Sequence, residues 1–307
     1  MSYFTTIFIN VVLPILILMG VGALMQKKFS FQLGQISTLI TYCFMPAAIF
    51  INVYQTRFEA QLFGQLVLYL GLFTVSLMIF GSLLAKMLKL NRGEAATLKN
   101  SISLMNSNNY GLPVSQLVFS TNPLGVSIQI IIIVLQNLLT YTYGLYNLLS
   151  ASKSALGILK SLMKLPIIHA LILGLVFVLL DLQLPAFALI PLEQLSNGFI
   201  GLALILLGAQ LSGIKIKSFH RVITWSLIGR LIAGPAFAFG FIWLLGIEGV
   251  LAQSLFIASA FPTSRNTATI AFEYNVEPDL TAQVVLYTTL LSSITVTIVI
   301  YLSMVLF

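Results

Sequence analysis

Two polar, proline-bearing clusters interrupt otherwise apolar stretches of the sequence. The first runs Asn106-Ser107-Asn108-Asn109-Tyr110-Gly111-Leu112-Pro113, and the second runs Phe261-Pro262-Thr263-Ser264-Arg265-Asn266-Thr267. Proline removes a backbone donor and obstructs the preceding helical turn, so each cluster predicts a break within a helix. The half-helices that start at such a break would direct N–H groups and positive dipole ends into the gap. This arrangement favours a bound anion.

Arg265 is the cation within these clusters. It could clamp a carboxylate, or serve as a fixed charge in place of a coupling cation; the alternative is an arginine that caps broken-helix carbonyls. Downstream of the first cluster, Asn137 and Tyr141 are four residues apart and should share one helical face. They could form a polar rim or interhelical hydrogen bonds. The candidate substrate-binding residues are Asn106, Asn108, Asn109, Gly111, Pro113, Gln136, Asn137, Tyr141, Pro262, Thr263, Ser264, Arg265 and Asn266.

Several other chemistries lack the residues they need. No Asp or Glu lies near the centre of an expected helix, which argues against a pump or antiporter for cations. The Ser, Thr and Tyr residues have no neighbouring base, so no nucleophilic triad can be built and no enzyme is expected. His169, His220 and Cys43 have no other metal-ligating residues at suitable spacing, and we expect no metal and no cofactor.

Four further residues favour structural interpretations. Arg230 should pair with another group or snorkel to the membrane surface, with a place on the substrate path as the alternative. Lys99, about one turn after Glu94, predicts an ion pair with it. Gly20 and Gly22 lie inside an apolar stretch and are interpreted as helix-packing contacts.

The composition places all these residues in a membrane protein. Of 307 residues, 59% are hydrophobic and 7% are charged, and the mean hydropathy is +1.03. Soluble domains carry about a quarter charged residues. Roughly ten spans of about 20 residues fit this length. The expected helices are 4–25, 33–54, 62–88, 94–119, 125–149, 164–181, 192–212, 219–245, 249–274 and 279–306.

The basic residues indicate an orientation in the cytoplasmic membrane. The net charge of +7 follows from 15 Lys and Arg against 8 Asp and Glu. Eleven of the basic residues fall in the odd-numbered loops, and only Arg57 falls in an even-numbered one. Cytoplasmic loops collect Lys and Arg, so both termini are expected outside, and nucleic acid is not an expected partner.

The two halves of the sequence correspond under one shift. Adding 154 maps Glu94 to Glu248, Asn108 to Pro262 and Gln129 to Gln283. Five helices per half place the second half upside down relative to the first, and matching broken helices in inverted halves indicate a transporter site. The expected organisation is a first repeat over 1–150, a linker over 151–163 and a second repeat over 164–307.

Short motifs in order along nearly the whole chain resemble the auxin efflux carrier family. They are Met45-Pro46-Ala47-Ala48, Asn108-Asn109-Tyr110-Gly111-Leu112-Pro113, Val134-Leu135-Gln136-Asn137 with Tyr141, Leu206-Leu207-Gly208-Ala209, Ala260-Phe261-Pro262, Ala271-Phe272-Glu273-Tyr274 and Thr288-Thr289-Leu290-Leu291-Ser292. The chain is similar to bacterial members called malate or malonate permeases, and more distantly to plant PIN auxin exporters.

The resemblance implies ten helices in two inverted five-helix repeats, with the fourth and ninth crossing at their breaks. It also implies a homodimer, with helices 1, 2, 6 and 7 as scaffold and the others as a moving unit. Asn108, Asn109, Asn137, Tyr141 and Arg265 would contact substrate. We therefore expect an elevator-type transporter of small organic anions within the lipid bilayer. The alternatives are a cation/proton antiporter and a sodium-coupled organic anion symporter of related fold.

Overall fold

The computed structural model describes residues 5, 8–55, 60–149, 166–214 and 220–307, and this part of the chain is helical without a β-sheet. Seven helical stretches in it are long and apolar enough to cross a membrane. A polytopic, all-helical membrane protein is therefore confirmed as the fold class. The expected linker, 151–163, lies outside the described residues. The expected count of ten spans and the inverted repeat stay predictions.

The first half of the chain contains long helices joined by short π-helical segments. Its elements are η1 (Phe8–Val12), α2 (Leu13–Phe29), α3 (Leu33–Leu39), η2 (Ile40–Phe44), α4 (Met45–Tyr54), α5 (Ala60–Met87), α6 (Arg92–Ser103), η3 (Ser107–Gly111), α7 (Leu112–Val118), α8 (Pro123–Leu139), η4 (Thr140–Gly144) and α9 (Leu145–Leu149). Asn91 and Glu94 form a capping box that starts α6.

The described part of the second half also consists of α-helices and contains one π-helical segment. Its elements are α11 (Pro166–Leu179), α12 (Ala186–Ser212), α13 (Arg221–Leu227), η5 (Ile228–Ala233), α14 (Gly234–Leu244), α15 (Gly249–Ser259), α16 (Arg265–Glu273) and α17 (Pro278–Leu306). The side chain of His220 caps α13 by accepting a hydrogen bond from the Val222 N–H at 3.3 Å.

Two expected helix limits are wrong. The helix expected over 192–212 begins six residues earlier, at Ala186, and contains Pro191. Pro191 is the sixth residue of α12 and lies beyond the first turn, so it removes one backbone hydrogen bond of the helix, which nevertheless continues through it. The first helix continues to Phe29, where Lys27 and Lys28 occupy its last turn. Cations are favoured at that end of a helix by the macrodipole.

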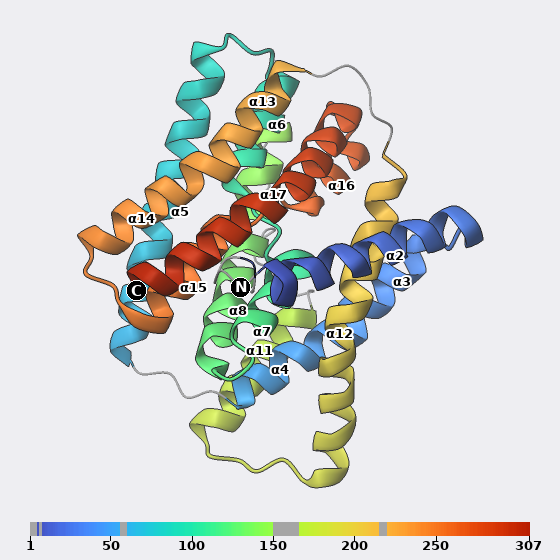
Figure 1. The fold of residues 1–307 in the computed structure, drawn as a ribbon, viewed down its shortest axis with the longest axis vertical. Helices are drawn as coiled ribbons and strands as arrows, with labels where there is room; N and C mark the ends of the chain where they lie inside the picture. Colours follow the sequence, from blue (N-terminus) through green and yellow to red (C-terminus); the bar gives the residue numbers. More distant parts are fainter. Residues whose placement is uncertain (1–4, 6–7, 56–59, 150–165, 215–219) are drawn as a thin grey trace.

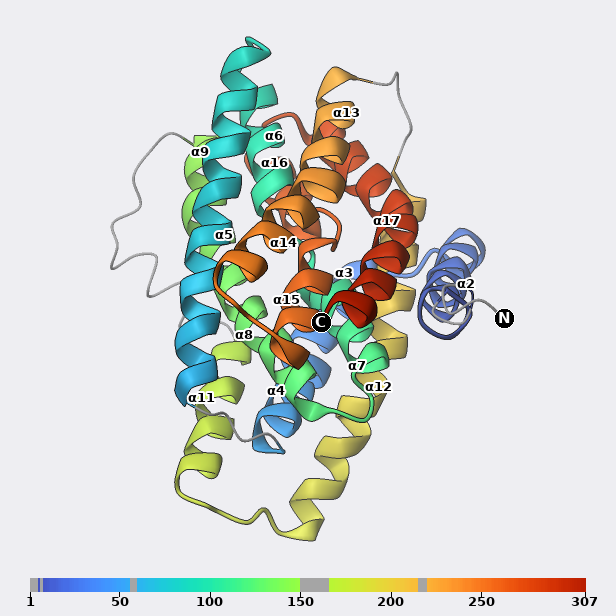
Figure 2. The same ribbon diagram turned by 60° about the vertical axis from the view of Figure 1, so that its left-hand side comes forward.

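The helices form two packed groups (Figures 1 and 2). In the α12 group, α12 packs against α2 and α4, and α4 packs against α11. In the α17 group, α17 packs against α13, α15 and α16, while α5 packs against α6 and α14. The helices α7 and α8 lie between the groups, because α7 contacts α12 and α8 contacts both α4 and α15.

Glycines allow the closest helix contact in the α12 group. A Cβ atom on Gly22 of α2 would overlap the backbone of Ile205, and one on Gly208 of α12 would overlap the backbone of Met19. A Cβ on Gly20 would meet nothing within 4 Å. Small residues at such positions let two helix backbones approach closely in a membrane.

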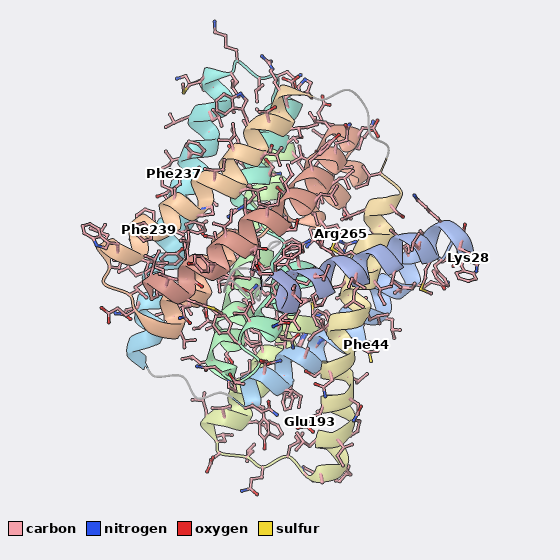
Figure 3. All side chains as sticks on the ribbon, viewed as in Figure 1. Lys28, Phe44, Glu193, Phe237, Phe239 and Arg265 are labelled. Carbon is pink, nitrogen blue, oxygen red and sulfur yellow. The ribbon has the colours of Figure 1, made fainter. Side chains whose placement is uncertain are left out.

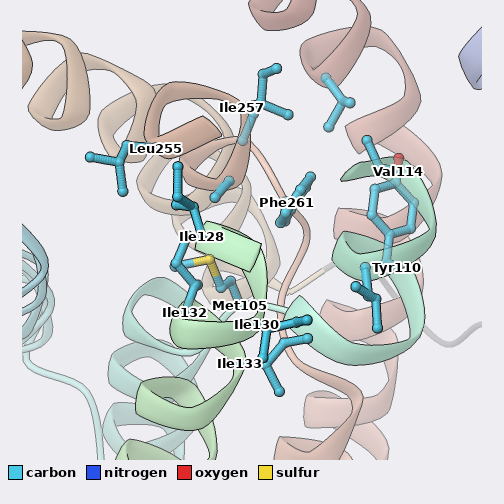
Figure 4. Packing of buried hydrophobic residues seen from close by; sticks show 14 of the residues in the cluster. Met105, Tyr110, Val114, Ile128, Ile130, Ile132, Ile133, Leu255, Ile257 and Phe261 are labelled. Atoms are coloured by element: carbon cyan, nitrogen blue, oxygen red, sulfur yellow. The ribbon is translucent and has the colours of Figure 1, made fainter. Parts of the chain in front are cut away.

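An apolar core surrounds the region where the α15 and α16 segment meets α7 and α8 (Figure 4). Tyr110 and Phe261 make an edge contact there, with ring centroids 6.0 Å apart, and both side chains are buried. Ile128, Ile132 and Leu255 pack around the same segment. This packing fixes the irregular backbone described next.

Candidate functional site

Both polar clusters leave the helical conformation, and their backbones cross. The chain is not helical between α6 and η3 or between α15 and α16. Met105 and Thr263 form an antiparallel bridge at this point. The Asn106 N–H donates to the Pro262 carbonyl at 2.8 Å, and the Ser264 N–H donates to the Leu104 carbonyl at 2.8 Å. Each break therefore satisfies backbone groups that the other break leaves unpaired.

Side chains brace this crossing. Gln136 Oε1 accepts a hydrogen bond from the Met105 N–H at 3.0 Å, and Gln129 Nε2 donates to the Ser107 carbonyl at 3.0 Å. Thr263 Oγ1 donates to the Ser101 carbonyl at 3.0 Å. Gly111 keeps the space beside Gln129 open, since a Cβ there would lie 2.7 Å from Gln129 Nε2. These contacts hold non-helical backbone inside the protein, as membrane proteins require.

A polar cavity of about 270 Å³ lies against the crossing. The N-terminal turns of η3 and α16 both contribute to its wall, together with the end of α8 and the start of η4. Eight of the expected binding residues line it. They are Asn106, Asn108, Asn109, Gln136, Asn137, Ser264, Arg265 and Asn266.

Four more of the expected residues lie outside the cavity wall. Thr263 is buried in the bridge, and Pro262 supplies the carbonyl that Asn106 binds. Gly111 and Pro113 are buried at the junction of η3 and α7. Tyr141 lies in η4, and its side chain is outside the described part of the structure.

Sequence reasoning missed eight cavity residues. They are Ser37, Thr41, Met45, Met105, Ser107, Thr140, Pro166 and Thr269. Ser37 and Thr41 are small polar residues within an otherwise largely apolar helical stretch, and this is the sequence signal that could have pointed to them. The π-helical segment η2 lies between Ser37 and Met45, so α-helical spacing alone does not place the three side chains on one face.

The cavity favours negative charge. Arg265 is the first residue of α16 and lines the wall, and no Asp or Glu is among the described lining residues. Figure 3 shows Arg265 near the middle of the molecule. The N–H groups of a first helical turn have no partners within the helix, and the dipole adds partial positive charge. The Nδ2 atom of Asn106 is buried without a hydrogen-bond partner.

Two charged residues outside the cavity have partners that the sequence did not predict. Arg230 does not snorkel, because it is 0% exposed; Nη1 donates to the Ile102 carbonyl and Nη2 to the Ser259 carbonyl. Glu94 does not pair with Lys99. It lies 3.3 Å from His220 Nε2 and 3.6 Å from Arg221 Nη2, because α13 begins beside the start of α6.

The fold and this cavity define a polytopic membrane protein with a polar site at crossed, broken helices. The sequence matches the family described as "Membrane transport protein" over residues 7–300. The chain belongs to this family, the auxin efflux carrier family of transporters. It is 28% identical over 298 residues to an uncharacterized transporter of Methanocaldococcus jannaschii, a match that covers 92% of this chain and 94% of the relative.

Proposed function

We propose that this protein is a secondary transporter of small organic anions, namely mono- or dicarboxylates such as malate or malonate. One observation carries the proposal: the cavity gathers Arg265, amide side chains and two helix N-termini, with no described carboxylate in its wall. Charge-assisted hydrogen bonds from such donors are the stronger ones available for a carboxylate. Membership of a transporter family supports movement of the bound anion across a membrane.

Arg265 supplies the counter-charge in this proposal, and the Asn side chains of the first break orient the carboxylate. Asn106, Asn108 and Asn109 reach the cavity from the first break, and Asn266 reaches it from the second. A side-chain amide has two N–H donors, and each can donate a hydrogen bond to either oxygen of a carboxylate. The site would therefore fix the charged end of the substrate and leave its remainder in the cavity.

The proposed architecture has ten spans in two inverted repeats. Each half contains one helix that breaks: α6 leads to η3 and α7, and α15 leads to α16. Two shorter apolar helices, Ile168–Leu179 and Gly249–Ser259, would add two spans to the seven long stretches, and the broken helix from α6 to α7 would be the tenth. A homodimer stays a prediction from the family resemblance.

The cavity would face the cytoplasm in this structure. Ser37 and Thr41 lie in the first turns that follow the loop after Lys27 and Lys28, and Pro166 begins α11. Loops rich in Lys and Arg stay on the cytoplasmic side. Both chain termini would then lie outside, in the orientation expected for a cytoplasmic membrane.

A second polar cavity supports alternating access. It has a volume of about 480 Å³ and is lined by residues that include Asn52, Gln116, Glu193 and Asn197. Both cavities touch the α8 helix and its continuation, the second at Val126 and the first at Gln136. Ten helical residues separate these positions by about 15 Å. Movement of the α17 group along the α12 group would expose the anion to each cavity in turn.

The test is ligand-dependent thermal stabilisation of the purified protein. Malate, malonate, succinate, lactate and an indole carboxylate are each added with and without sodium at two pH values. A ligand that binds the folded state raises the melting temperature by mass action. We expect one acid to stabilise the wild type, and Arg265→Gln to weaken its binding about 10- to 100-fold.

Arg221→Gln is the matched control, because Arg221 is an exposed arginine paired with Glu94 outside the cavity. It should leave the binding curve unchanged. Wild-type affinity in Arg265→Gln would remove the counter-charge role. Stabilisation by sodium alone, with no response to any acid, would overturn the anion proposal in favour of a cation-coupled one.

A further inference from the structure

Arg230 is the largest side chain in the described structure that is fully buried. Nη1 lies 2.6 Å from the Ile102 carbonyl oxygen, and Nη2 lies 2.5 Å from the Ser259 carbonyl oxygen. Ile102 is next to the last residue of α6, and Ser259 is the last residue of α15. One guanidinium group therefore joins the C-terminal ends of both half-helices that break.

Those two helix ends need a cation. The last carbonyls of a helix have no partners within it and carry the negative end of the macrodipole. A guanidinium group presents its donors in a fixed plane, so it can serve two carbonyls at once. The carbonyl ends thus find their counter-charge on the side of the crossing formed by η5, while the N-terminal turns of η3 and α16 face the cavity.

Glycines make room for this contact. A Cβ on Gly234 would lie 2.9 Å from Arg230 Nη2 and 3.1 Å from the Ser259 carbonyl oxygen. A Cβ on Gly229 would lie 2.6 Å from the Ile102 side chain. Gly234, one turn after Arg230, therefore leaves the space that the guanidinium occupies, and Gly229 leaves space for the Ile102 side chain.

The positive charge of Arg230 is not matched by an acid. Among the described residues no Asp or Glu lies within ion-pair distance of it, and its Nε has no hydrogen-bond partner. The buried tyrosine that interacts with it electrostatically, Tyr69, has an unpartnered hydroxyl. Carbonyl dipoles offset a full charge only in part, so positive potential extends through the crossing.

We propose that Arg230 is a positioning residue with two roles: it locks the two half-helix ends together, and its fixed charge makes the cavity on the other side of the crossing selective for anions. This inference deepens the proposed anion transport. Its test measures the cavity potential without any substrate, so it can fail or succeed independently of the transport proposal.

The experiment uses one reporter cysteine. Cys43, the single cysteine, is replaced by serine, and Asn266→Cys then places a thiol in the cavity. The readout is the ratio of reaction rates with sulfonatoethyl methanethiosulfonate, an anion, and trimethylammonioethyl methanethiosulfonate, a cation. Asn197→Cys in the second cavity, combined with Glu193→Gln to remove the acid in that wall, gives the reference ratio, since accessibility and thiol reactivity affect both reagents alike.

Two variants separate the two roles. Arg230→Gln removes the charge and should lower the anion-to-cation ratio at least about tenfold, because a nearby buried charge acts oppositely on the two reagents. Arg230→Lys keeps the charge and should keep the ratio, while its melting temperature falls because one ammonium cannot replace the planar fork. A ratio within twofold of wild type in Arg230→Gln would overturn the electrostatic role.

Two further variants keep the proposal testable if Arg230→Gln does not fold. Gly234→Ala should lower the melting temperature without changing the ratio, because it displaces the guanidinium but keeps its charge. Arg265→Gln removes the cavity arginine, and Arg230 should still hold the ratio above the Asn197→Cys reference. A fall to that reference would show that Arg230 contributes no potential, and an unchanged melting temperature in Gly234→Ala would overturn the lock.

Discussion

Asparagine side chains around the first break have different hydrogen-bonding states. Asn100 Nδ2 donates to the Gly144 carbonyl at 3.0 Å, and its Oδ1 accepts from Asn147 Nδ2 at 2.8 Å. Asn106, only 4% exposed, has a buried Nδ2 with no partner. A buried unpaired donor is unfavourable, and a ligand that accepts a hydrogen bond from it removes that cost. Asn100 therefore stabilises the fold, and Asn106 is placed to bind.

Asn106→Ala should weaken binding of the stabilising carboxylate about tenfold, by loss of one hydrogen bond to a charged group. The ligand-free protein should keep or raise its melting temperature, because the unpaired Nδ2 disappears. Titration calorimetry and melting curves give the two values.

Asn100→Ala is the matched control, since it leaves the Gly144 carbonyl and Asn147 Nδ2 unpaired. It should lower stability by roughly 1–3 kcal/mol while the folded fraction binds the ligand as the wild type does. If Asn106→Ala lost stability and kept its affinity, the division between these two residues would be reversed.

The sequence predicted which polar residues lie near the site better than it predicted the groups to which they form hydrogen bonds. Amides beside Gly and Pro stand out in an apolar stretch, so eight expected residues reach the cavity. Arg230 also stands out by type, but its partners Ile102 and Ser259 bind through carbonyls, which every residue has. Residue spacing cannot reveal such a partner, and Ile102 lies more than a hundred residues from Arg230 in the sequence.

At the scale of elements, π-helical segments limit what residue spacing can predict. Residues Thr140–Gly144 form η4, so the four-residue interval from Asn137 to Tyr141 runs into a π-helical segment. Thr140, the first residue of that segment, lines the cavity. The segment η5 likewise carries Arg230. A π segment inserts extra backbone into a helix and is common at functional sites, but the sequence carries no clear signal for it.

Helix contacts within the α12 group lead to a prediction with a control on the same helix. Gly22→Ala should lower stability by roughly 1–3 kcal/mol, because its methyl group overlaps the backbone of α12 at Ile205. Gly20→Ala should be neutral or stabilising, since nothing lies within 4 Å and alanine favours helix by about 1 kcal/mol.

Melting temperatures of both variants, measured in one detergent, test this predicted difference in stability. Equal losses would mean that α2 does not approach α12 at Gly22. From the sequence, both glycines are interpreted as packing contacts. Only the structure shows that Gly22 faces α12 and Gly20 does not, because a sequence pattern does not give the direction of the neighbouring helix.

At the scale of the whole molecule, the two groups differ in how their helices are joined. Within the α17 group, Thr97 of α6 and Thr281 of α17 have hydroxyls 2.9 Å apart. At the edge of the α12 group, α8, which also packs against α15 of the α17 group, contacts α4: Ser127 Oγ donates to the Asn52 carbonyl at 3.2 Å. If α8 moves with the α17 group past the α12 group during transport, the second contact must break and the first must persist.

Cross-links at these two places test the sliding motion directly. In a Cys43→Ser background, Asn52→Cys with Ser127→Cys joins α4 to α8, and Thr97→Cys with Thr281→Cys joins two helices of the α17 group. A short bifunctional methanethiosulfonate closes each pair in protein reconstituted in vesicles. The first link should stop carboxylate flux, because an elevator movement needs the groups to separate, and a reducing agent should restore it.

The second link should leave flux near the wild-type rate, because it lies within a group that moves as one body. Binding of the carboxylate should survive the first link, since the cavity at the crossing remains open on its own side. Flux that continued at full rate through the Asn52–Ser127 link would exclude sliding at this boundary. Transport would then have to arise from local opening at the crossing, where the two half-helix ends held by Arg230 would separate.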